Sequence, residues 1–125
     1  MKPVAALLIA LSSLTYAAEP APDLKASGWV SLGKADFAPV NGAPDTWQWK
    51  EDGTLHCTGQ PIGVMRTVKE YKNFEMSISW CHLKPAGNSG VFVWAPKDAL
   101  DKLTKPGLPD AGIEVQVLDL GFTEH

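Results

Sequence analysis

Three polar side chains that could do acid–base chemistry stand close together near the C-terminal end of the chain. Glu114, Gln116 and Asp119 are spaced i, i+2 and i+5 within an otherwise apolar run that is typical of a β-strand. Because side chains alternate between the two faces of a strand, Glu114 and Gln116 share a face, and a β-bulge would be needed to bring Asp119 beside them. One positioned carboxylate can act as a general base, so these three residues are the catalytic candidates. The bland alternative is the solvated face of an edge strand.

Residues that suit ligand binding lie earlier in the chain. Asn88 and Ser89 precede Gly90, and their amide and hydroxyl groups would form hydrogen bonds to a ligand at the rim of a cleft, although Asn-Ser-Gly is also a turn sequence. Trp94 follows this segment toward a loop, where an indole can stack on the face of a ligand ring. We therefore predict Asn88, Ser89 and Trp94 as substrate-binding residues.

Candidate metal ligands are sparse. Glu114, Asp119, Glu124 and His125 carry the right chemistry, but no H-E-x-x-H or comparable spacing links them. The metal is left unassigned, with Glu114 and His125 as the candidate ligands of a divalent ion. The favoured alternative for His125, as the last residue given, is simple exposure to solvent.

Turn signals divide the chain into short stretches with the composition of strands. The predicted strands are 47–50, 54–58, 74–83, 91–94 and 112–119. Asp52-Gly53 supplies the bend of a first hairpin, and a Gly-rich turn leads from 74–83 into 91–94 as a second hairpin. Residues 97–105 have the spacing of a short helix. Strands with one apolar face need a covering layer, so we predict an all-β fold, an antiparallel β-sandwich.

Composition excludes several classes of protein. The chain of 125 residues holds 11 Lys and Arg against 14 Asp and Glu, which gives a net charge of −3 and no clustered cations for nucleic acid. The 11 glycines and 10 prolines predict many turns. The two cysteines contain no C-x-x-C pair, which argues against structural zinc. Cys57 and Cys81 are left as either a disulfide or two buried thiols.

The N-terminus has the pattern of a secretory signal. Residues 1–17 combine Lys2, a short apolar run and small residues before a cleavage point. Eleven apolar residues span about 16 Å as a helix, roughly half of a bilayer core, which argues against an uncleaved anchor. We therefore predict a signal peptide at 1–17, an extended lead-in at 18–27 and a folded domain at 28–125. The mature protein is expected to be secreted or periplasmic, without an integral membrane span.

Four segments carry a family resemblance. In chain order they are WQWKEDGTL (47–55), EYKNFE (70–75), GNSGVF (87–92) and GIEVQVLD (112–119). Together they resemble the 3-keto-disaccharide hydrolase family, also described as 3-keto-glucoside lyase and 2-hydroxy-glucal hydratase, over about residue 28 to the C-terminus. The resemblance implies a concanavalin-A-like jelly roll, of the lectin and glucanase type, acting on sugars outside the cytoplasm. It also implies that this chain is the N-terminal part of a longer, truncated domain. Trp94 departs from the family pattern, which often has Arg there.

The resemblance implies an enzyme that cleaves 3-keto-glycosides. The C3 ketone acidifies the hydrogen on C2, so Glu114 can abstract that proton, the glycosidic oxygen can depart from C1, and water can add to the resulting 2-hydroxy-glucal. Gln116 would position a sugar hydroxyl or the reacting carbonyl. Hydrogen-bond donors or a divalent metal ion must stabilise the enediolate.

Two alternatives stay beside this reading. The strand at 112–119 also resembles that of laminarinase-type glycosidases, but Gln116 stands in place of their middle Asp, and a retaining glycosidase needs two carboxyls about 5 to 5.5 Å apart. A non-catalytic carbohydrate-binding or cell-wall interaction module on the same fold would need only aromatic and amide side chains.

Overall fold

Short antiparallel strands dominate the part of the chain that the structure describes. The computed structural model describes residues 23–25 and 28–124. The strands are β1 (Phe37–Pro39), β2 (Trp47–Trp49), β3 (Leu55–Cys57), β4 (Met65–Thr67), β5 (Asn88–Val93) and β6 (Ile113–Leu118). The helices are α1 (Lys97–Asp101) and two 3-10 helices, Lys34–Asp36 and Leu120–Glu124. The predicted signal peptide at 1–17 lies outside the described residues.

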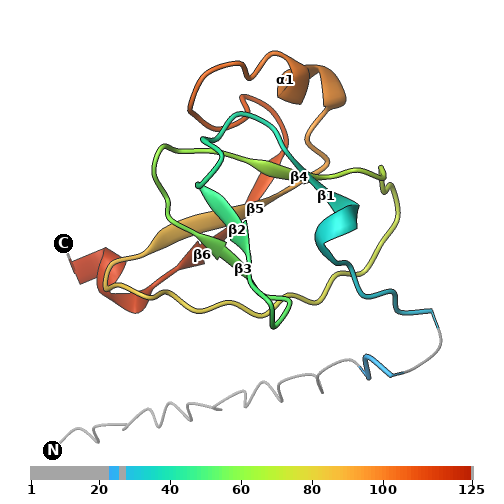
Figure 1. Cartoon of the computed structure of the whole chain (residues 1–125), viewed down its shortest axis with the longest axis horizontal. Helices are drawn as coiled ribbons and strands as arrows, with labels where there is room; N and C mark the ends of the chain where they lie inside the picture. The colour runs from blue at the N-terminus through green and yellow to red at the C-terminus, as the bar shows by residue number, and fades with distance from the viewer. Residues whose placement is uncertain (1–22, 26–27, 125) are drawn as a thin grey trace, which may run out of the picture.

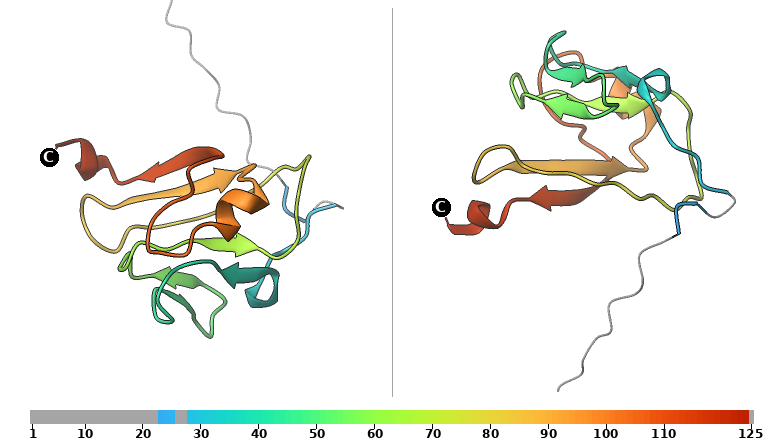
Figure 2. Two further views of the ribbon diagram at one scale, coloured as in Figure 1. Left: turned by 90° about the horizontal axis from the view of Figure 1, so that it is seen from above. Right: turned by 60° about the horizontal axis from the view of Figure 1, so that its bottom comes forward.

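The strands form three two-stranded sheets arranged in two layers. β1 pairs with β4, β2 with β3 and β5 with β6, always antiparallel. The two smaller sheets lie on one side, and the β5–β6 sheet passes beneath them (Figure 1, and the right view of Figure 2). The predicted all-β class and antiparallel pairing are confirmed, while the complete jelly roll stays a prediction.

The first predicted hairpin is confirmed as β2–β3. Trp47 pairs with Cys57 and Trp49 with Leu55. Gly53 takes φ +82 in the bend, a left-handed conformation that glycine adopts without steric cost. The carboxylate of the preceding Asp52 accepts hydrogen bonds from the Thr54 hydroxyl at 2.7 Å and the Thr54 N–H at 2.9 Å. These bonds lower the pKa of Asp52 below its ordinary value, the side-chain bond most.

The strand predicted at 74–83 is wrong. This segment belongs to no regular element, and within the described residues no backbone hydrogen bond joins it to a neighbouring strand. Side chains hold it at both ends, where the Phe74 ring meets Trp94 and the His82 ring meets the Val117 carbonyl. It runs along the β5–β6 sheet (Figure 2). Alternation fixes which side chains share a face, but a strand also needs a partner for its backbone groups.

The second predicted hairpin is wrong for the same reason. β5 begins at Asn88 and pairs with β6 rather than with 74–83. The turn falls before it, where Ala86 takes φ +57. Asn-Ser-Gly therefore opens a strand instead of forming the predicted turn. The helical prediction for 97–105 is confirmed over Lys97–Asp101.

Few side chains are fully buried. Among the described residues, the buried apolar side chains are Ala99 and Val117, and the buried polar one is Thr46. Thr46 lies against Gly42, and its backbone carbonyl accepts the Thr58 N–H at 2.9 Å, which ties two loops together. No helix within residues 23–25 and 28–124 is long and apolar enough to cross a membrane.

The cysteines follow neither alternative left by the sequence. Cys57 and Cys81 are both free, so no disulfide joins them. Both are also exposed, so they are not buried thiols. Cys57 lies at the end of β3, and Cys81 lies in the unpaired segment 74–83.

Candidate functional site

The register of β5 and β6 brings three predicted site residues to one sheet face. Residues directly opposite each other in an antiparallel pair project to the same side. Asn88, Glu114 and Gln116 therefore share a face, which we call the Glu114 face. The opposed pairs on it are Phe92 with Glu114, Gly90 with Gln116 and Asn88 with Leu118.

Glu114 reaches diagonally across the sheet and lies over Gly90. A Cβ added to Gly90 would stand 2.1 Å from Oε1 of Glu114, 2.6 Å from its Cγ and 2.7 Å from its Cδ. Gly90 is opposite Gln116, so the carboxylate lies over the row of the sheet from which Gln116 projects. Glu114 is half-buried, whereas Gln116 and Asn88 are exposed. The face thus offers one partly shielded carboxylate beside two accessible amides.

Ser89 lies on the other side of the sheet. It pairs with Val117, in the row of alternating residues that includes Val91 and Val115. The structure therefore separates Ser89 from Glu114, although the two were predicted for one site. The sequence suggested a turn at this position, in which neighbouring side chains can gather, whereas a strand sends them to opposite faces.

Asp119 follows the end of β6 and closes the turn before β5. Pairing is one-to-one through Leu118, so no bulge turns Asp119 onto the Glu114 face. Its carboxylate accepts the Ala86 N–H at 2.8 Å, and its own N–H donates to the Gly87 carbonyl at 2.8 Å. The side chain is engaged with the turn that leads into β5.

Trp94 is held firmly at the end of β5. Its backbone takes φ +52, a left-handed conformation that is uncommon for a bulky residue. The indole N–H donates to the Lys72 carbonyl at 3.1 Å, and the ring lies 6.0 Å from that of Phe74, tilted by 52°. The side chain is nevertheless 61% exposed. It lies two residues beyond Phe92, the partner of Glu114.

His82 and His56 differ in their hydrogen bonding. The His82 ring nitrogen Nε2 lies 2.8 Å from the Val117 carbonyl. Its ring covers Gly87, where an added Cβ would stand 2.2 Å from Nδ1. In His56, by contrast, the buried Nδ1 has no hydrogen-bond partner.

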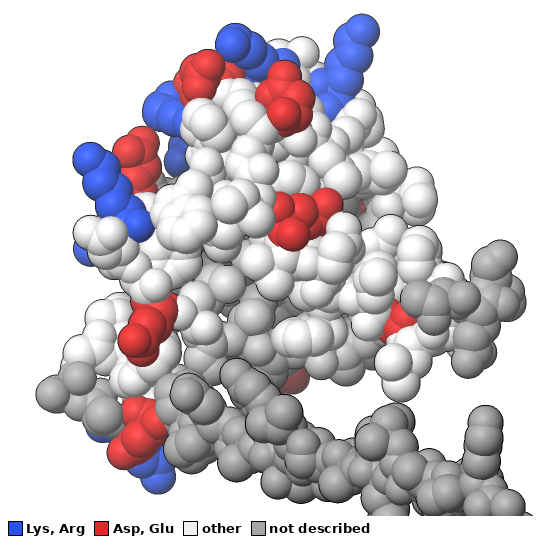
Figure 3. Space-filling view, turned by 180° about the vertical axis from the view of Figure 1, so that it is seen from behind, with Lys and Arg blue, Asp and Glu red and all other residues white. Residues whose placement is uncertain are grey.

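The candidate metal ligands do not form a cluster in the described part of the chain. No group of three or more His, Cys, Asp or Glu side chains there could hold a metal ion. His125 lies outside the described residues. Seen from behind, charged side chains of both signs gather near the top, where α1 lies, and the middle of this face is uncharged except for acidic side chains near its centre (Figure 3).

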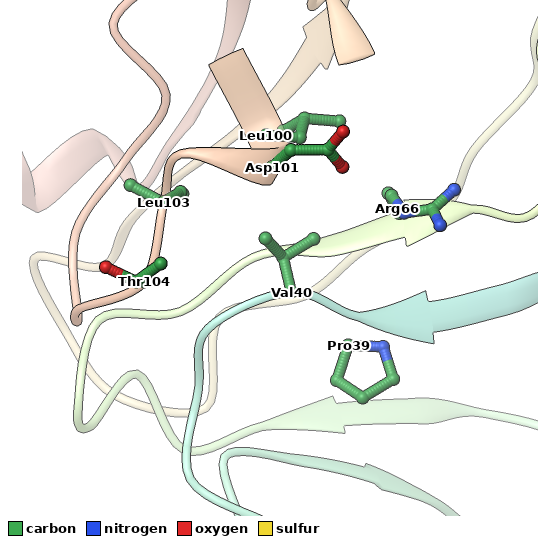
Figure 4. Close-up of a pocket in the computed structure, with 7 residues that line it drawn as sticks. All are labelled: Pro39, Val40, Arg66, Leu100, Asp101, Leu103 and Thr104. Carbon is green, nitrogen blue, oxygen red and sulfur yellow. The ribbon is translucent and has the colours of Figure 1, made fainter. Parts of the chain in front are cut away.

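A hollow of about 260 Å³ lies elsewhere, between β1, β4 and the α1 region. Arg66 and Asp101 border it together with apolar side chains (Figure 4). None of the predicted site residues lines it. The residues that line it are Pro39, Val40, Arg66, Leu100, Asp101, Leu103 and Thr104.

An all-β fold does not by itself assign a function to the carboxylate and amides on this sheet face. A family model described as the 3-keto-alpha-glucoside-1,2-lyase-like domain matches residues 22–124. The chain belongs to this family, and the predicted resemblance is confirmed. The family supports a carbohydrate-active role. No match to a curated protein or to a solved structure was found.

Sequence reasoning missed Gly90 as part of the site. The motif drew attention to the amide and hydroxyl of Asn-Ser-Gly and treated the glycine as a turn residue. A signal was present, because Gly90 directly precedes the β-branched and aromatic run 91–94, and a glycine within a strand often marks a close approach. Only the pairing with β6 shows which group approaches.

Proposed function

We propose that this protein cleaves 3-keto-glycosides by elimination, with Glu114 as the general base. The observation that carries the proposal is the half-buried Glu114 carboxylate seated on Gly90, on a face that also presents Gln116 and Asn88. Membership of the 3-keto-alpha-glucoside-1,2-lyase-like family supports the substrate class.

The reaction needs one base and a stabilised oxyanion. Glu114 takes the proton from C2, and the C–H electrons form an enediolate with the C3 carbonyl. When the carbonyl re-forms, a double bond forms between C1 and C2 and the glycosidic oxygen leaves C1, taking up a proton. Water then adds across that double bond, its hydroxyl to C1 and its hydrogen to C2. The products are those of hydrolysis.

The side-chain amides of Gln116 and Asn88 supply the stabilisation of the oxyanion. Gln116 and Asn88 carry N–H donors on the same face as Glu114, and donors aimed at developing negative charge are among the largest contributions to catalysis. Gln116 holds the enediolate oxygen or the reacting carbonyl, and Asn88 holds a sugar hydroxyl.

Trp94 and Asp119 take supporting roles in this proposal. The exposed indole of Trp94, fixed by Lys72, offers a flat surface for a pyranose ring beyond Phe92. Asp119 holds the turn before β5 through the Ala86 N–H, and so fixes the start of the strand that carries Asn88.

Secretion or export to the periplasm is part of the proposal. It is supported by the signal-like composition of residues 1–17. N-terminal sequencing of the protein recovered outside the cytoplasm should give Ala18 as the first residue. A mature protein that retains Met1 would contradict export by cleavage.

A carbohydrate-binding module is the second candidate. The specific observation in its favour is Trp94, which is 61% exposed while its indole N–H donates to the Lys72 carbonyl. A binding module would retain sugars without turnover. Its binding would be weakened by Trp94→Ala and left unchanged by Glu114→Gln.

The deciding experiment compares Glu114→Gln with Glu75→Gln in the full protein. Glu75 is an exposed glutamate of segment 74–83 and serves as the matched control. The assay offers a 3-keto-glucoside labelled with deuterium at C2, beside the parent glucoside. Glu114→Gln should lower turnover by about 10² to 10⁴ and Glu75→Gln should leave it unchanged. Full activity of Glu114→Gln would remove Glu114 from the mechanism.

A further inference from the structure

We infer that Gly90 is a positioning residue for Glu114, because the absence of a side chain at position 90 creates the seat in which the carboxylate lies. The inference rests on the proposed function for its catalytic consequence. Its geometric content concerns only the two residues and the sheet that carries them.

The backbone does not explain why position 90 is glycine. Gly90 lies inside β5 and is not among the residues with positive φ, so its conformation is open to any amino acid. A glycine within a strand weakens it, since glycine loses more freedom on folding and contributes no packing. The reason for glycine must therefore lie in the space above it.

That space is filled by Glu114. Oε1, Cγ and Cδ of Glu114 all lie within 2.7 Å of where a Cβ of residue 90 would stand, which is far inside van der Waals contact. Contact along three atoms means that the side chain lies along the sheet over the glycine. It does not extend straight out from its own position opposite Phe92. The carboxylate therefore lies over the Gly90–Gln116 pair and not over its own pair, Phe92–Glu114.

An alanine at position 90 would act on Glu114 rather than on the fold. The clashing atoms belong to the outer part of a flexible, half-buried side chain, which can swing away while the strands stay paired. The carboxylate would then leave the row of Gln116. Misplacing a catalytic group by about 1 Å can cost on the order of 10²-fold in rate, so the effect on activity should far exceed the effect on folding.

The experiment measures kcat and KM of Gly90→Ala in the full protein on the C2-labelled 3-keto-glucoside. We expect kcat to fall about 10- to 100-fold with little change in KM. Two other glycine-to-alanine variants serve as controls. Gly33→Ala meets no atom within 4 Å and should behave as wild type. Gly87→Ala displaces the His82 ring instead of Glu114, so it should lower thermal stability and leave kcat unchanged.

A double-mutant cycle separates positioning from general damage. If Gly90 acts through Glu114, adding Gly90→Ala to Glu114→Gln should cause no further loss of kcat, because the group that it displaces has already lost its function. Losses that multiply in the double variant would overturn the inference. An unchanged kcat for Gly90→Ala, beside a strongly reduced one for Glu114→Gln, would overturn the inference and leave the proposed function intact.

A structural measurement that needs no activity assay separates the contact between Gly90 and Glu114 from the catalytic role proposed for Glu114. NMR of the wild-type protein should show a nuclear Overhauser contact between the Glu114 γ-methylene protons and the Gly90 α protons, and Gly90→Ala should displace the Glu114 side-chain signals. Absence of that contact would overturn the inference. Presence of the contact, together with full activity of Glu114→Gln, would support the seat and refute the catalytic role proposed for it.

Discussion

Two segments with the same alternating pattern behave differently in this protein. Residues 112–119 form β6, which pairs with β5 in unbroken register. Residues 74–83 alternate equally regularly, yet belong to no strand and leave their apolar side chains exposed. The apolar side chains of that row are Phe74, Met76, Ile78 and Trp80, each 39–57% exposed.

The contrast shows that alternation and pairing are separate pieces of information. Alternation states which residues would share a face, and it does so without reference to any other part of the chain. Pairing requires another strand at hydrogen-bonding distance with matching direction and register. β6 meets both conditions, so its polar row becomes a defined site face. Segment 74–83 meets only the first.

Amide hydrogen exchange should show the largest difference between the β5–β6 sheet and segment 74–83. The amides of the β5–β6 ladder are held by cross-strand bonds, whereas those of 74–83 have no strand partner among the described residues. We expect ladder amides at the centre of β5 and β6 to exchange about a thousandfold more slowly than those of 74–83, measured by NMR or mass spectrometry. Equal protection in both regions would show that 74–83 is paired in solution.

Replacement of single apolar side chains by alanine should give the next largest difference, in the free energy of unfolding. Val117 is 7% exposed and Val115, on the same strand face, is 51% exposed. Val117→Ala should therefore lower the free energy of unfolding by about 2 kcal/mol, because it removes buried methyl groups and leaves a cavity. Val115→Ala and Ile78→Ala should each change it by less than about 0.5 kcal/mol. Urea denaturation measures all three, and a large loss for Ile78→Ala would contradict the exposed state of segment 74–83.

Substitutions of Asp119 test the turn at Ala86, which joins segment 74–83 to β5. Asp119→Ala leaves the Ala86 N–H without its acceptor, which should cost about 1 kcal/mol in thermal or urea unfolding. Asp119→Asn retains an acceptor oxygen and should keep both stability and turnover near wild type. A loss of turnover in Asp119→Asn without loss of stability would instead support Asp119 as a catalytic carboxylate.

The smallest expected effect concerns the β2–β3 hairpin, which has only three residue pairs. The Thr54 hydroxyl, and then its N–H, hold the pKa of Asp52 below the ordinary 3.8. A depressed folded-state pKa stabilises the folded protein above the unfolded-state pKa, and this contribution is lost as pH falls through the lower value. Thermal unfolding of wild type and Asp52→Asn should therefore differ slightly at pH 5 to 7 and converge only as the pH falls below 3.8 and through the lowered pKa of Asp52. Glu51→Gln is the control, and a difference that persists at low pH would contradict the assignment.

Much of the local structure was predictable because its causes are local. Asp52-Gly53 carries the turn chemistry of a hairpin, and β2–β3 formed around it. The Glu114 and Gln116 pair was placed on one face by alternation alone, and the register agrees. The strand predicted at 74–83 and the Asn-Ser-Gly turn were wrong because each depended on a partner strand.

The sequence by itself determined the all-β class, the family and the shared face of Glu114 and Gln116, because composition, motif order and period-two alternation are properties of the chain alone. Tertiary structure decided that β5 pairs with β6, that Ser89 leaves the site face and that Asp119 closes a turn. It also decided that Gly90 lies under the carboxylate. These outcomes depend on which strand lies opposite which residue. The β5–β6 register joins positions 20 or more residues apart, which no local pattern encodes.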